Sequence, residues 1–74
     1  LKNVFVRYGE GVIAAMLNDL LVKFPELMLG SYPVLDLPDY KVKVTLESKD
    51  SQYLDQALQT FVASLPADAV QRID

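Results

Sequence analysis

Residues 40–47 decide the fold of this chain, and they read Tyr40-Lys41-Val42-Lys43-Val44-Thr45-Leu46-Glu47. Apolar residues occupy every second position and polar residues the positions between them, which is the period of a strand with one buried face. We predict that the apolar set lies against a core: Tyr40, Val42, Val44 and Leu46. The polar set is predicted to face away from that core: Lys41, Lys43, Thr45 and Glu47.

Two stretches with the period of a helix lie on either side of this strand. The first is predicted over residues 10–23, and its apolar stripe comprises Ile13, Met16, Leu17, Leu20, Leu21 and Phe24. Pro25 blocks its continuation, because proline lacks the backbone N–H that a helix needs. The second stripe comprises Leu54, Ala57, Leu58, Phe61, Val62 and Leu65. Ser48 or Asp50 is its predicted cap, and Pro66 ends it.

Three further segments have the character of strands, and together with the helices they predict the fold. Residues 4–8 alternate up to Gly9, residues 27–32 stop at Pro33, and residues 69–73 form a short final strand. A loop is predicted over residues 33–39. Because crossovers between parallel strands are right-handed, both helices are expected on one face of a small sheet. The fold class is therefore α+β, a two-layer β-α-β-β-α(-β) sandwich of the KH-like or ferredoxin-like kind, in which the last strand is optional and the other sheet face is open.

The composition indicates one small domain with little catalytic equipment. The chain has 74 residues, of which 51% are apolar, and it contains no His, Cys or Trp. Nucleophilic triads therefore lack their usual base, and zinc lacks its usual ligands. No apolar run is long enough to span a bilayer, so we expect a cytoplasmic protein without membrane contact. We interpret residues 1–74 as a single domain cut from a longer protein, since the chain begins at Leu1 without Met.

Two pairs of carboxylates are interpreted as structural. Asp36 with Asp39, and Glu47 with Asp50, lie in turn-like sequence where capping and solubility explain them. Neither pair follows the pattern of a calcium-binding loop. We therefore expect no metal site in this chain.

The segment Arg7-Tyr8-Gly9-Glu10-Gly11 was weighed as an anion site. Glycines before a helix expose backbone N–H groups that can hold an anion, as in the acylphosphatases. That chemistry also needs an Asn to orient the attacking water, and neither Asn3 nor Asn18 lies where it is needed. We therefore interpret the segment as a flexible turn and expect no catalytic or cofactor-binding residue.

The open face of the predicted sheet is the candidate binding surface. If the first and third strands are neighbours, five side chains project from it: Phe5, Arg7, Lys41, Lys43 and Thr45. Such a mixture can stack a base and neutralise phosphates, so a nucleic-acid or nucleotide binding module is the alternative hypothesis. The net charge of -3 disfavours nucleic acid, and the Gly-x-x-Gly loop of RNA-binding KH domains is missing. A half-apolar sheet face more often docks onto another domain.

A family resemblance adds to this interpretation. Gly30-Ser31-Tyr32-Pro33, followed by the pattern Tyr-x-Val-x-x-Thr-Leu over residues 40–46 and by Ser48-Lys49-Asp50, resembles a particular accessory domain. It is the KH-like domain that follows the molybdopterin-binding-like domain in CinA-type proteins and eukaryotic FAD synthases. The resemblance covers about residues 4–70.

The resemblance implies a non-catalytic role. In that family the pyrophosphatase-like chemistry on dinucleotides belongs to the preceding domain, and FAD synthesis or nicotinamide-ribotide deamidation to a following one. No catalytic residue is therefore transferred to this chain, although its parent is expected to be a nucleotide pyrophosphatase or an FAD synthase. The expected partners are neighbouring domains of the parent chain or a second copy. The motif itself has a structural interpretation, in which Gly30 permits close packing, Tyr32 covers the core and Pro33 ends the strand.

Overall fold

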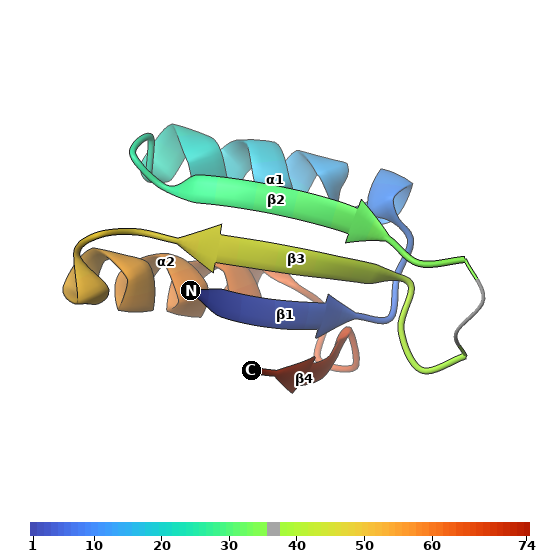
Figure 1. Ribbon diagram of the computed structural model, residues 1–74. Coiled ribbons are helices and arrows are strands. Elements are labelled where there is room, and N and C mark those ends of the chain that lie inside the picture. Colours follow the sequence, from blue (N-terminus) through green and yellow to red (C-terminus); the bar gives the residue numbers. More distant parts are fainter. Residues whose placement is uncertain (36–37) are drawn as a thin grey trace.

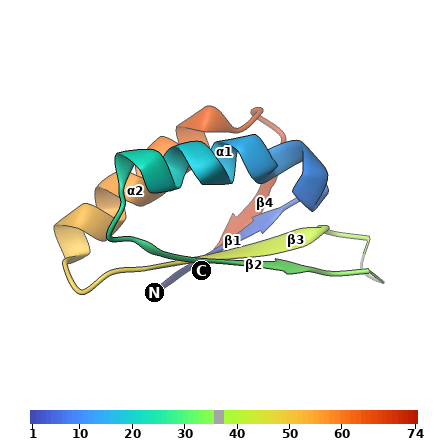
Figure 2. The same ribbon diagram turned by 90° about the horizontal axis from the view of Figure 1, so that it is seen from above.

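A computed structural model describes residues 1–35 and 38–74. The described elements are β1 (Lys2–Val6), α1 (Glu10–Lys23), β2 (Met28–Pro33), β3 (Val42–Glu47), α2 (Ser51–Ser64) and β4 (Val70–Ile73). The strands form an antiparallel sheet in the order β2-β3-β1-β4, and both helices lie on the same face of it (Figures 1 and 2). This confirms the predicted two-layer α+β sandwich. The strand order is that of the two split βαβ units of ferredoxin-like folds.

The core lies between the helices and the sheet face that they cover. It is built from Val4, Val6, Val42, Val44 and Leu46 of the sheet, Ile13, Leu17 and Leu20 of α1, and Leu54, Ala57 and Phe61 of α2. The alternation along β3 is confirmed, because its three apolar residues are all buried. Full burial of an apolar side chain of this size contributes about 1.5–3 kcal/mol, so this cluster is what holds the two layers together.

The predicted bounds of the first and third strands differ from the structure by two residues. The first strand covers Lys2–Val6 instead of residues 4–8, and β3 begins at Val42 instead of Tyr40. Tyr40 therefore does not face the core; its ring packs edge-on against Phe5, with centroids 4.7 Å apart, on the opposite face of the sheet. The cause is a bend at Lys41, whose N–H donates to Val6 and whose carbonyl accepts from Val34. A residue in a regular antiparallel strand directs its N–H and its carbonyl to the same neighbouring strand. Lys41 directs them to opposite sides, so the alternation of side chains breaks at this residue.

The turn before α2 is fixed by the two residues that were predicted as alternative caps. Asp50 is the N-cap, and its Oδ1 accepts from the backbone N–H groups of Gln52 (2.9 Å) and Tyr53 (3.3 Å). The Ser48 hydroxyl accepts from the N–H of Asp50 at 3.2 Å. The Asp50 carboxylate therefore has a structural role, since it accepts hydrogen bonds from the first N–H groups of α2. Asp36, of the other carboxylate pair, lies outside the described residues.

Candidate interaction surfaces

The open sheet face unites only part of the predicted binding set. β1 and β3 are neighbours, and Phe5 pairs with Lys43 while Asn3 pairs with Thr45. Phe5, Lys43 and Thr45 therefore share the open face. Arg7 and Lys41 lie beyond the ends of their strands, so the structure does not bring all five residues onto one surface.

Phe5 is not available for stacking, although it lies on the open face. Only 5% of it is exposed, because the Tyr40 ring packs against one side and the Arg72 guanidinium lies 4.1 Å from the ring centroid. Base stacking on an aromatic side chain needs a free ring face. Arg72 is in turn paired with Asp74 at 3.2 Å. Sequence reasoning missed Arg72, since only the pairing of β1 with β4 brings it opposite Phe5.

Tyr32 is the aromatic side chain that the open face does expose, at 56% of its surface. It pairs across the sheet with Lys43, so it does not cover the core as its structural interpretation had supposed. A Cβ placed on Gly30 would lie 2.6 Å from Thr45 Oγ1 and 2.9 Å from Tyr32 Cε2. The Tyr32 ring therefore lies across the space that Gly30 leaves free. This packing explains the Gly-x-Tyr part of the motif without any ligand.

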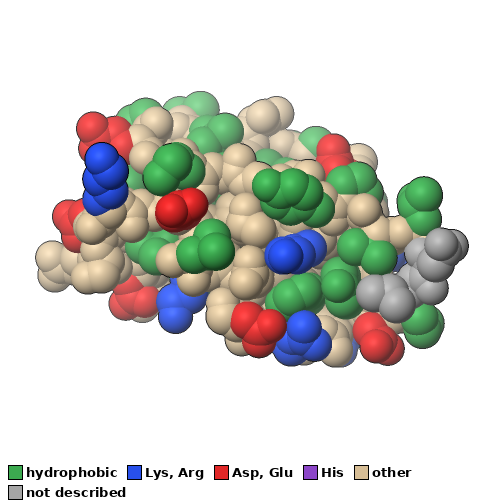
Figure 3. Space-filling view, in the orientation of Figure 1, with side chains coloured by type: hydrophobic (Ala, Val, Ile, Leu, Met, Phe, Trp, Pro, Cys, Tyr) green, Lys and Arg blue, Asp and Glu red, His purple; other side chains and the backbone are tan. Residues whose placement is uncertain are grey.

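The open face carries charges of both signs. Figure 3 looks onto it and shows apolar, basic and acidic side chains interspersed over the sheet, without a basic patch. Nucleic-acid binding depends largely on a cluster of positive charge that contacts the phosphates. No observation on this face therefore favours the nucleic-acid hypothesis.

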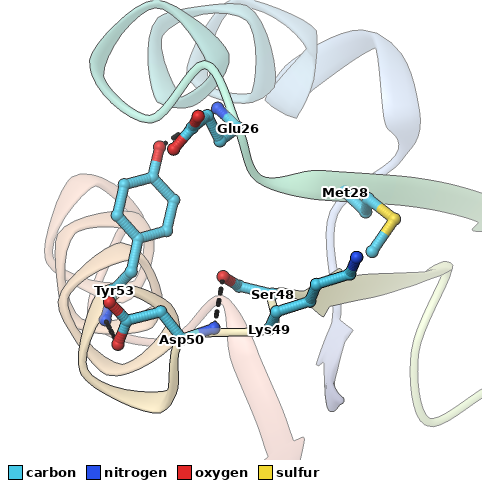
Figure 4. A pocket seen from close by; sticks show the side chains of 6 residues that line it. All are labelled: Glu26, Met28, Ser48, Lys49, Asp50 and Tyr53. Carbon is cyan, nitrogen blue, oxygen red and sulfur yellow. Dashed lines mark hydrogen bonds between the residues drawn. The ribbon is translucent and has the colours of Figure 1, made fainter.

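A half-open pocket of about 400 Å³ lies where α1 leads into β2 and β3 leads into α2 (Figure 4). It is lined by Glu26, Met28, Ser48, Lys49, Asp50 and Tyr53. The Tyr53 hydroxyl accepts from the backbone N–H of Glu26 at 3.1 Å, and the Tyr53 ring packs edge-on against Phe24. Three polar side chains of the pocket, those of Ser48, Asp50 and Tyr53, therefore make hydrogen bonds within the two turns that form it. Over the described ranges, no group of three potential metal ligands occurs here or elsewhere.

The segment weighed as an anion site is anchored to the opposite end of the chain. The Arg7 guanidinium donates to the carbonyls of Asp68 (3.0 Å) and Val70 (3.4 Å), and the Tyr8 hydroxyl donates to Asp68 Oδ1 at 2.7 Å. This hydrogen bond, together with partial desolvation and the charge of Asp68, raises the pKa of Tyr8. Arg7 is therefore turned toward the start of β4. Neither Gly9 nor Gly11 has a positive φ or a neighbour that a Cβ would strike.

The outer surfaces of the two helices differ in kind. On α1, Val12 is 58% exposed and Val22 80% exposed, with Ala15 between them and Gly11 and the polar Asn18 beside Val22 also exposed. On α2 the exposed positions are mostly polar: Ser51, Gln52, Asp55, Gln56, Gln59, Ala63 and Ser64. A helix with apolar residues outside its core-facing stripe is more often covered by a further layer of protein than one with a uniformly polar outer face. The signal lies in the sequence of residues 10–23, where apolar residues also occupy positions outside the predicted stripe.

Comparison with known protein families identifies the family of this chain. The family model described as FAD synthase, middle domain, matches residues 1–74, which is the whole chain. The chain belongs to this family. The match agrees with the FAD-synthase branch of the resemblance carried by the Gly30–Pro33 motif. Within residues 1–35 and 38–74, no helix has the length and apolar character that crossing a membrane requires.

Proposed function

We propose that this domain is a non-catalytic accessory part of an FAD synthase and acts by contact with a neighbouring domain of the same enzyme. The observation that carries the proposal is the apolar outer face of α1, a surface that α2 does not have. Membership of a family described as FAD synthase middle domains supports a neighbouring domain as the partner, since the word middle implies domains on either side.

The chemistry of α1 suits a helix that packs against a second layer. Val12 and Val22 present apolar side chains, and the small residues Ala15 and Gly11 beside them let another element approach closely. Asp19 and Lys23 lie on the flank toward α2, at the margin of this face. Contacts between domains of one chain typically bury about 600–1,500 Å² in total, which a helix of 14 residues and its surroundings can provide.

Substitution of Val22 in the complete FAD synthase tests the proposed contact. Val22→Glu places a charge in the apolar face, and Gln56→Glu places the same charge on the outer face of α2 as a matched control. Val22→Glu should speed limited proteolysis at the domain junctions about tenfold, which corresponds to about 1.4 kcal/mol of lost docking. Both variants should unfold at the wild-type temperature as the separate domain. If Val22→Glu and Gln56→Glu are cleaved at the same rate, the α1 face does not contact a neighbouring domain.

The non-catalytic role is tested separately. We expect the separate domain to hydrolyse neither FAD nor ADP-ribose above a buffer blank. Turnover by the purified domain that is lost on heat denaturation would contradict the assignment. We further propose the cytoplasm as the location, which fractionation of cells expressing the complete enzyme checks; recovery in a membrane or secreted fraction would contradict it.

A further inference from the structure

We propose that two copies of this domain associate through the free edge of β2 and the flank of α1 that lies above it, forming one continuous sheet. The inference extends the proposed function by naming a second partner, the same chain, at a different surface. It rests on three observations: the direction of the backbone groups of β2, the lack of protection of this edge, and the composition of the flank above it.

The backbone groups that β2 leaves free are defined by its pairing with β3. The N–H of Val34 donates to the carbonyl of Lys41 at 2.8 Å, and Pro33 pairs with Val42 in an uninterrupted antiparallel register. Hydrogen-bonding direction alternates along a strand, so Met28, Gly30 and Tyr32 direct their backbone groups to β3. The outward-directed residues are therefore Leu29, Ser31 and Pro33. Pro33 has no N–H, and it stands where the N–H would face away from the sheet.

Apart from Pro33 at its end, the β2 edge lacks the features that normally prevent edge-to-edge pairing. Natural edge strands are short, charged, interrupted by a bulge or supplied with proline. β4, at the other edge, has four residues, includes Arg72 and contains an irregularity in its pairing with β1. β2 has six residues, carries no charge and pairs with β3 without a bulge. One edge of the sheet is thus protected, while the other is open to a further strand.

The flank of α1 above this edge is also suited to contact. The Ser31 hydroxyl donates to Glu10 Oε2 at 3.2 Å, which fixes the side of α1 that lies over β2. At 100° per residue, Ala14 and Leu21 lie on the same flank as Glu10, and both are exposed. Figure 2 looks onto this edge and shows α1 lying along β2. The opposite flank, with Met16, Asp19 and Lys23, faces α2.

A second copy of the chain fits this surface by symmetry. A two-fold axis perpendicular to the sheet would lay β2 antiparallel to its own copy and bring the two α1 flanks together. The outward residues can pair only with one another, and the axis positions that form the most hydrogen bonds are Gly30 and Ser31. Either register gives four new N–H···O=C bonds. An uncharged strand meets its own copy without repulsion, and Glu10 is the charged residue that the two flanks would bring closest.

The area that a stable dimer requires is a modest share of the surface of this chain. A stable interface buries about 800 Å² on each partner, roughly a sixth of the 4686 Å² surface of this chain. The edge of β2 and the length of α1 together extend along the longest dimension of the molecule, which measures 33 Å. The dimer would convert two open edges into the centre of an eight-stranded sheet.

Sedimentation equilibrium of the 74-residue chain tests the dimer. We expect a concentration-dependent shift from the monomer mass of 8.3 kDa to twice that value. Ser31→Pro removes an outward N–H that the fold does not use, and it should leave a monomer at every concentration tested. Ser31→Ala keeps the N–H and removes the hydroxyl, so it is the matched control and should still dimerise. A wild-type chain that stays monomeric at millimolar concentration overturns the proposal.

A second pair of variants covers the case in which Ser31→Pro does not fold. Ala14→Glu adds a charge to the α1 flank near Glu10, and it should weaken dimerisation at least tenfold. Ala63→Glu adds the same charge to the exposed surface of α2 and should have no effect. Equal dimerisation by both variants refutes the proposed surface. Val22 lies on the outer face of α1 instead of this flank, so the loss of the dimer would leave the result of Val22→Glu, and the proposed function, unaffected.

Discussion

Gly30→Ala should destabilise the domain because of two identified neighbours. The new Cβ would lie 2.6 Å from Thr45 Oγ1, 2.9 Å from Tyr32 Cε2 and 3.0 Å from the Tyr32 hydroxyl oxygen. Contacts below 3.0 Å force a neighbour to move, and overpacking of this kind costs about 1–3 kcal/mol. Against this, alanine is favoured over glycine within a strand by about 0.5–1 kcal/mol. The expected net loss is therefore between about 0 and 2.5 kcal/mol, centred near 1 kcal/mol.

The same substitution should reverse its effect when both neighbours are truncated. In a Tyr32→Ala, Thr45→Ala background nothing opposes the new Cβ, so Gly30→Ala should stabilise by about 0.5–1 kcal/mol. The difference between the two backgrounds is a coupling free energy of about 1–3 kcal/mol. Urea unfolding followed by circular dichroism measures it. An equal cost of Gly30→Ala in both backgrounds would refute the packing explanation of the motif and favour a contact outside this chain.

Three further predictions concern the contacts that hold the turns and the open face. Asp50→Ala should cost about 1 kcal/mol and lower the melting temperature by about 4–8 °C, because it removes the cap of α2; Asp55→Ala, on the exposed side of the same helix, is the control, and equal melting temperatures would contradict the cap. The phenol of Tyr8 should titrate above 10, and Asp68→Asn should return its pKa toward that value in an ultraviolet titration. The folded state holds the phenol proton more tightly than the unfolded state does. The stability contributed by the Tyr8–Asp68 hydrogen bond is therefore present below pH 10 and lost as the pH rises through the raised pKa of Tyr8. An unchanged Tyr8 pKa in Asp68→Asn would show that this hydrogen bond is absent. Arg72→Ala should cost about 0.5–1 kcal/mol through loss of the cation–π contact with Phe5, whereas Arg72→Lys should retain part of it; a loss of the same size in Arg72→Ala on a Phe5→Leu background would contradict this cause.

The fold could be predicted from the sequence because its signals are local and agree with one another. The alternation over residues 42–47, the helical stripes and the prolines at positions 25, 33 and 66 each restrict one segment. Right-handed crossover then leaves few arrangements of those segments. Tyr40 was misassigned because the break in alternation at Lys41 comes from hydrogen bonds to Val6 and Val34, which are distant in sequence.

The candidate surfaces were predicted less well, because exposure depends on neighbours in space. Phe5 was assigned to an open face correctly, but Arg72 and Tyr40 cover it from segments that the sequence does not place beside it. The free edge of β2 also depends on strand order, which makes β2 an outer strand and β3 an inner one. The apolar outer face of α1 could have been found, since Val12, Ala15 and Val22 lie off the core stripe in the sequence itself.

We propose that this domain works through contact made by the α1 side of the sandwich. Hydrogen–deuterium exchange of the complete FAD synthase, compared with the separate domain, tests this contact most directly. We expect slower exchange in peptides covering Glu10–Lys23 when the rest of the enzyme is present, with Ser51–Ser64 unchanged. Slower exchange confined to α2 or to the open sheet face, with α1 unaffected, would contradict it.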